Sequence, residues 1–139
     1  MSYEERGQWV YIVANVVTLG GYVAILLSRS GTTPLTEVDY VPLMLGAIGF
    51  AIALSIAGRI LIEIVRPSES LVEDVRDRDI GRFGEYLGGI VLAIAMIVPF
   101  ALAVARSDTF WIANAMYLAY ALASLAGTTV KLVAYRRGF

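Results

Sequence analysis

The chain has 139 residues and a formal net charge of −1, and 58% of its residues are hydrophobic. Its mean hydropathy of +0.72 is too high for an ordinary soluble domain, and the small net charge gives no field that would attract nucleic acid. The sequence contains no cysteine and no histidine. This excludes disulfides and thiolate ligands, and it removes the commonest general base and the commonest metal ligand.

Four windows contain no Asp, Glu, Lys or Arg, and each is about 20 residues long, enough to cross a hydrocarbon core of about 30 Å. The windows are Gly7–Ser28, Tyr40–Gly58, Tyr86–Ala105 and Thr109–Val130. They predict an all-α polytopic membrane protein, in which residues 1–139 form a single domain of four transmembrane helices.

The first span is expected at about Gln8–Leu27. It is expected to be retained rather than cleaved, because its flank is acidic and no A-x-A site follows it. Polar residues recur along this span every three or four positions, which places them on one helix face. They are Tyr11, Asn15, Thr18 and Tyr22.

Small residues predict where the helices approach one another closely. They form ridges in the second span, at about 40–65, the third, at about 83–105, and the fourth, at about 110–135. The ridges are Gly49, Ala53 and Ala57; Gly84 and Gly88; and Ala115, Ala119, Ala123 and Gly127. Pro99 predicts a kink in the third span. Such ridges favour a homodimer, but contacts within one copy could also use them.

Only Arg106–Asp108 separates the third and fourth spans, so these two spans are expected to be antiparallel neighbours. The fourth span carries a polar stripe beside its small-residue ridge. The stripe consists of Asn114, Tyr117, Ser124, Thr128 and Lys131.

The main polar segment is 66–85, which holds ten of the chain's 23 charged residues. A capping-box pattern, Ser70 to Glu73, predicts that a helix begins at Leu71. Among the short polar segments, seven Lys/Arg residues fall on the side of this segment and two on the other. The positive-inside rule therefore predicts cytoplasmic N and C termini, with the charged segment also in the cytoplasm.

Three stretches carry a resemblance to a known family. They are Glu73–Ile80 (EDVRDRDI), Phe110–Ala115 and Lys131–Phe139. Together they resemble a family of small prokaryotic integral membrane proteins of unknown function, whose members carry a "DERD"-like motif before the third span. The match departs from that motif at Val75, where many relatives have Glu, and it covers the first two spans only by hydropathy.

The resemblance implies a four-span fold in a prokaryotic inner membrane rather than an activity. Proteins of this kind often accompany small helix-turn-helix regulators, so the resemblance also implies a cytoplasmic regulatory protein as a partner.

Four charged side chains are expected at one level near the cytoplasmic interface. They are Arg59, Glu63, Glu85 and Lys131. They either reach the headgroups separately or form a paired network that fixes the packing or lines a vestibule. The amides Asn15 and Asn114 lie deeper and at different depths. They are interpreted as interhelical hydrogen-bonding groups or, alternatively, as the lining of a substrate path.

The charged segment has three interpretations: a solvated face, a docking surface for a cytoplasmic partner, or a metal site. The candidate docking residues are Asp74, Arg76, Asp77, Arg78, Asp79 and Arg82. The metal interpretation is the weakest, because the segment lacks the glycine and the trailing glutamate of an EF-hand loop. No catalytic constellation, cofactor motif or metal site stands out, so the protein is not expected to be an enzyme.

Two function classes follow. The first is a structural or regulatory membrane subunit that binds membrane lipid or a cytoplasmic partner through its charged segment. The second is a small transporter or channel with a polar path between spans one and four. The two classes differ in whether the polar stripes face a wet cavity or a dry core.

Overall fold

In a computed structural model of the protein, residues 3–65, 67 and 75–137 are described; they are 89% helical and contain no strand. The helices are α1 (Tyr3–Arg29), α2 (Val41–Val65), α3 (Val75–Ala95), α4 (Ile97–Val104) and α5 (Thr109–Arg137), with a short 3-10 helix η1 (Leu35–Glu37). Within these residues, four helical segments are long and apolar enough to cross a membrane, α3 and α4 together forming one of them. The prediction of an all-α protein with four helical segments long and apolar enough to span a membrane is thus confirmed.

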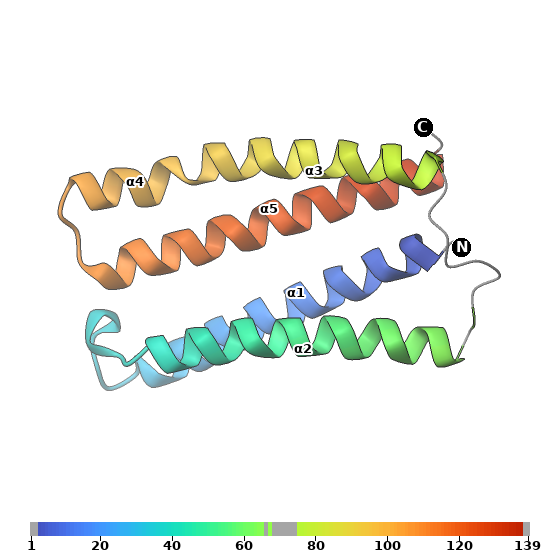
Figure 1. Ribbon diagram of the computed structural model, residues 1–139. Coiled ribbons are helices and arrows are strands. Elements are labelled where there is room, and N and C mark those ends of the chain that lie inside the picture. The colour runs from blue at the N-terminus through green and yellow to red at the C-terminus, as the bar shows by residue number, and fades with distance from the viewer. Residues whose placement is uncertain (1–2, 66, 68–74, 138–139) are drawn as a thin grey trace.

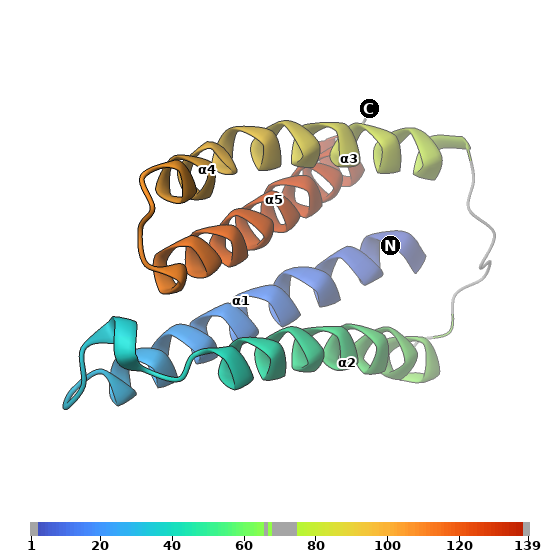
Figure 2. The same cartoon turned by 60° about the vertical axis from the view of Figure 1, so that its left-hand side comes forward.

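The helices form two hairpins that lie side by side (Figure 1). α1 contacts α2, α5 contacts α3 and α4, and α1 and α5 meet in the centre. Figure 2 shows the same order, with α2 and α3 on the outside. Both chain ends lie at the end of the bundle where α1 begins and α2 ends, called here the charged end (Figure 1). The opposite end, called here the turn end, carries the connections between paired helices.

α1 begins at Tyr3, about one turn before the expected start of the first span. The acidic residues Glu4 and Glu5 fall in its first turn, where they favour the helix dipole. The longer helix also brings Glu4 and Arg6 beside α2. The side chains of Glu4 and Arg6 therefore belong to the bundle rather than to a flanking tail.

Glycines bring α3 and α5 into close contact. A Cβ added at Gly127 would lie 2.9 Å from the carbonyl oxygen of Gly84, and one added at Gly88 would lie 3.2 Å from the carbonyl oxygen of Ala123. Side chains at these positions would separate the backbones, which is the reason such ridges are enriched at helix contacts in membranes. In α2 the ridge of Gly49, Ala53 and Ala57 is exposed instead.

The third span breaks near Pro99, as its sequence predicts. α3 ends at Ala95 and α4 begins at Ile97, because Pro99 has no N–H to donate to the carbonyl of Ala95 and its ring crowds that carbonyl. At the turn end, Asp108 accepts a hydrogen bond from the backbone N–H of Phe110 at 2.8 Å and so caps α5. The predicted helix start at Leu71 lies outside the described residues.

A hydrophobic core closes the turn end. Tyr22, Leu26, Val38 and Phe110 are buried together, and residues from η1 and the start of α2 pack against them. By contrast, α2 buries none of its residues 41–65. Its exposed large apolar side chains suit a surface that faces lipid, since a helix satisfies its own backbone groups there.

Candidate functional site

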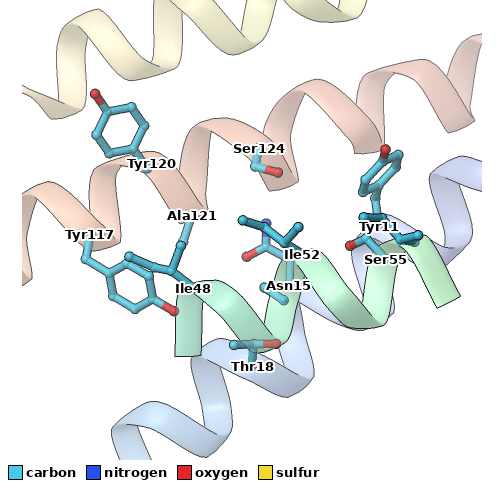
Figure 3. A pocket seen from close by; sticks show the side chains of 12 residues that line it. Tyr11, Asn15, Thr18, Ile48, Ile52, Ser55, Tyr117, Tyr120, Ala121 and Ser124 are labelled. Carbon is cyan, nitrogen blue, oxygen red and sulfur yellow. The ribbon is translucent and has the colours of Figure 1, made fainter. Parts of the chain in front are cut away.

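A hollow of about 400 Å³, called here the central groove, lies between α1, α2 and α5 (Figure 3). Its lining comes from all three helices: Tyr11, Asn15, Thr18, Ile48, Ala51, Ile52, Ser55, Ile56, Tyr117, Tyr120, Ala121 and Ser124. None of these twelve side chains carries a formal charge at neutral pH. The groove therefore offers hydroxyl, phenol and carboxamide groups, which suit a neutral polar or amphipathic molecule.

Both polar stripes predicted from the sequence contribute to the central groove. Tyr11, Asn15 and Thr18 come from α1, and Tyr117 and Ser124 come from α5. Figure 3 shows the Asn15 amide pointing from α1 toward the side where α5 carries Ser124. The stripes thus border a hollow over part of their length, as the transport hypothesis requires.

Thr18 carries a buried hydroxyl that is not satisfied by any described group. The residue is 5% exposed, and its hydroxyl oxygen has no hydrogen-bond partner among the described residues. A buried hydroxyl without a partner costs about 1–3 kcal/mol, so an occupant that supplies a hydrogen bond would recover part of this cost.

Asn114 does not line the central groove. Its side-chain oxygen accepts a hydrogen bond from the Tyr22 hydroxyl at 2.6 Å, and its amide donates to the carbonyl of Phe110 at 2.9 Å. The Tyr22 ring also meets the Tyr117 ring edge-on, with centroids 5.1 Å apart. These contacts agree with the interhelical role considered for Asn114, and they join α1 to α5 on the turn-end side of the groove.

Two further hollows adjoin the central groove. One of about 350 Å³, called here the lysine pocket, lies between α1, α3 and α5 and shares Tyr11 and Ser124 with the groove. The other, of about 530 Å³, lies between α1 and α2, shares Thr18 with the groove, and is mostly apolar. The three hollows therefore follow one another from the charged end toward Arg29 near the turn end.

The charged residues predicted at one level are held in ion pairs. Lys131 Nζ lies 3.5 Å from Glu85 Oε1, a pair that joins α5 to α3. Arg59 Nη2 lies 3.1 Å from Glu4 Oε1. Of the two possibilities left open by the sequence, separate snorkelling and pairing, the described contacts agree with pairing.

The partners of Arg59 and Glu63 were not those expected. Arg59 pairs with Glu4, and Glu63 lies 3.9 Å from Arg6, so both bonds join α2 to α1. The Arg59 guanidinium also lies 4.8 Å from the centre of the Tyr3 ring, within range of a cation–π interaction. The residues missed by the sequence analysis are Glu4 and Arg6, which were placed outside the first helix.

The described docking candidates lie at the start of α3. Asp77 accepts a hydrogen bond from the Tyr135 hydroxyl at 2.8 Å, and Arg76 donates one to the Tyr135 carbonyl at 3.4 Å. Arg78, Asp79 and Arg82 are exposed. Asp74 lies outside the described residues. Part of the candidate docking surface therefore also attaches α3 to α5.

Two lining residues carried no signal in the sequence. Ser55 is a lone serine in an apolar window, and Gln8 was treated as the edge of the first span, yet each lines a hollow. Gln8 could have been found by its spacing, since it precedes Tyr11 by three residues on the same helix face. In the part of the chain that the structure describes, no group of three or more Asp or Glu side chains could hold a metal ion.

Comparison with known proteins gives no assignment. No family model, no curated protein and no solved structure matches the chain.

Proposed function

We propose that this protein is a structural or regulatory subunit of a prokaryotic cytoplasmic membrane, and that its charged end docks a cytoplasmic protein. The single observation that carries the proposal is that the described part of the charged segment is helical and attached to α5. Asp77 and Arg76 each bond to Tyr135, a residue in the last turns of α5. A surface held in this way loses little conformational entropy when a partner binds.

The charge of this surface suggests the kind of partner. Basic side chains predominate among the exposed residues at the start of α3 and the end of α5: Arg76, Arg78, Arg82, Arg136 and Arg137. The excess of Lys and Arg on this side also supports a cytoplasmic orientation. An acidic surface on a regulatory protein would complement this end, with anionic lipid as the competing ligand.

The proposal predicts that a soluble partner binds in a charge-dependent way. Native protein purified in mild detergent should retain a stoichiometric soluble protein, identified by mass spectrometry. Arg82→Glu should reduce the retained amount at least about tenfold, because a like charge then faces the acidic partner. Arg106→Glu, the matched reversal at the turn end, should leave it unchanged. Equal retention by the wild type and Arg82→Glu would contradict docking through this surface.

A small transporter is the second candidate function. The observation in its favour is the succession of three hollows, which share Tyr11, Ser124 and Thr18 at their junctions. In this role, a neutral polar solute would give up hydrogen bonds to water as it enters the central groove. Asn15 and Thr18 in the uncharged lining would supply hydrogen bonds in their place.

This second candidate predicts glycerol permeation, with glycerol as a neutral hydrogen-bonding probe. Liposomes that contain the protein should swell faster in glycerol than empty liposomes, measured by light scattering after rapid mixing. Asn15→Leu should abolish the increase by removing the carboxamide from the groove, and Thr18→Val should reduce it. Thr129→Val is the matched control, since Thr129 is exposed and lies outside the groove lining. Swelling no faster than in empty liposomes would contradict the transport of small neutral solutes.

A further inference from the structure

The lysine pocket is rich in hydrogen-bond donors. Ten residues line it: Gln8, Tyr11, Gly84, Glu85, Gly88, Ala123, Ser124, Gly127, Thr128 and Lys131. Five of these side chains can donate hydrogen bonds, and Glu85 is the one carboxylate among the ten. Its volume of about 350 Å³ is within the range of small-molecule sites. A donor-rich lining with one cation suits an anionic group.

Gln8 contributes a buried side-chain amide to the lysine pocket. The residue is 8% exposed and lines the lysine pocket. Buried amides are normally hydrogen-bonded, because removing them from water without a partner is costly. An occupant of the pocket can accept a hydrogen bond from the Gln8 amide.

Lys131 is held in place by the glycine contact between α3 and α5. Its side chain crosses the position where a Cβ of Gly84 would lie, and any side chain there would overlap its methylene groups. The stem is thereby buried while the ammonium reaches the pocket, and the Lys131 side chain is 17% exposed. The cation is therefore already positioned and needs little ordering when an anion binds.

Glu85, the ion-pair partner of Lys131, can be displaced easily. The Glu85 side chain is 77% exposed, although its carboxylate lies 3.5 Å from the ammonium. An ion pair with one such exposed partner contributes only about 0.2–1 kcal/mol, so the carboxylate can turn toward solvent at small cost. The Glu85 carboxylate therefore competes with any other anion for Lys131.

We propose that the lysine pocket binds a phosphate group, which displaces Glu85 from Lys131 and accepts hydrogen bonds from Gln8 and Thr128. Lysine binds phosphate as a point charge, and the neighbouring amide and hydroxyl groups supply direction. The phosphate belongs either to a lipid headgroup or to a small soluble molecule, because the pocket lies near the charged end, within reach of both. This site does not depend on either function proposed above.

The test compares two variants that should change affinity in opposite directions. In an uncharged detergent, inorganic phosphate is titrated by calorimetry, and phosphatidylglycerol binding is measured by native mass spectrometry. Lys131→Gln should weaken binding at least about tenfold, because it removes a charge-assisted hydrogen bond. Glu85→Gln should strengthen binding about threefold, because it removes the competing carboxylate. Arg137→Gln, which removes one exposed charge from the same helix, should change it by less than about twofold.

Each result has a definite meaning. Binding of inorganic phosphate with this pattern supports a small soluble ligand, and binding of phosphatidylglycerol alone with the same pattern supports a lipid headgroup. A purely structural ion pair would not give tighter binding in Glu85→Gln. Weaker or unchanged binding in that variant, or no binding of either probe to the wild type, would overturn the proposal. The Glu85→Gln result does not rely on Lys131→Gln being folded.

Discussion

Replacing Gly127 with alanine should lower the free energy of unfolding by about 1–3 kcal/mol, the usual cost of overpacking a filled interface. The new methyl carbon would lie 2.9 Å from the carbonyl oxygen of Gly84. Backbone cannot rotate away as a flexible side chain can, so α3 and α5 would have to separate. Circular dichroism during thermal unfolding in detergent would measure the loss.

Gly89 provides a matched control for that substitution. It lies in α3 beside Gly88, yet a Cβ added there would meet no described heavy atom within 4 Å. Gly89→Ala should therefore leave stability unchanged or raise it by up to about 1 kcal/mol, because alanine is the better helix former. If the two variants lost stability equally, close approach at Gly127 would not explain the effect, and the glycine contact would lose its support.

Removing the carboxylate of Glu4 should destabilise the contact between α1 and α2 by about 1–2 kcal/mol, between the values for exposed and buried ion pairs. Its partner Arg59 is only 25% exposed along its side chain, and the Arg59 Nε atom has no hydrogen-bond partner among the described residues. Glu4→Gln would remove the negative charge that offsets the free-energy cost of desolvating the Arg59 guanidinium. The free energy of unfolding would be measured in detergent.

A double-mutant cycle separates the ion pair from other effects. Glu4→Gln and Arg59→Met should show a coupling energy of at least about 0.5 kcal/mol, as groups in contact do. Glu37→Gln makes the same change at an exposed acid in η1 and should have no effect. Additive losses in the Glu4 and Arg59 variants would mean that the two side chains do not stabilise each other.

Hydropathy and helix periodicity predicted much of the architecture. A run of about 20 uncharged residues must be helical in a membrane, because no water is present to satisfy its backbone, so the four spans followed directly. Pro99 predicted the break between α3 and α4, because proline has no backbone N–H to donate within a helix. The glycines at 84 and 88 indicated a close contact, but their partner Gly127 could be identified only from the packing of α3 on α5.

The candidate site was less predictable, because it depends on the rotation and exact start of each helix. Arg59 and Glu63 share a helix face, but their partners come from the first turns of α1, which the sequence analysis placed outside the span. Lys131 and Glu85 were named together from their depth, and they do meet. Ser55 faces the central groove only because of how α2 is turned toward α1 and α5, which no pattern in its apolar window indicates.

The position of α5 has a consequence for biosynthesis. α5 contacts α1, α3 and α4 and follows all three in the chain, so these helices are made before their common neighbour. The glycine face of α3 and the buried stripe of α1 remain without this partner until then. The bundle can therefore close only after α5 has been made, and a chain that stops before α5 keeps the earlier apolar helices but loses the helix that joins the two hairpins.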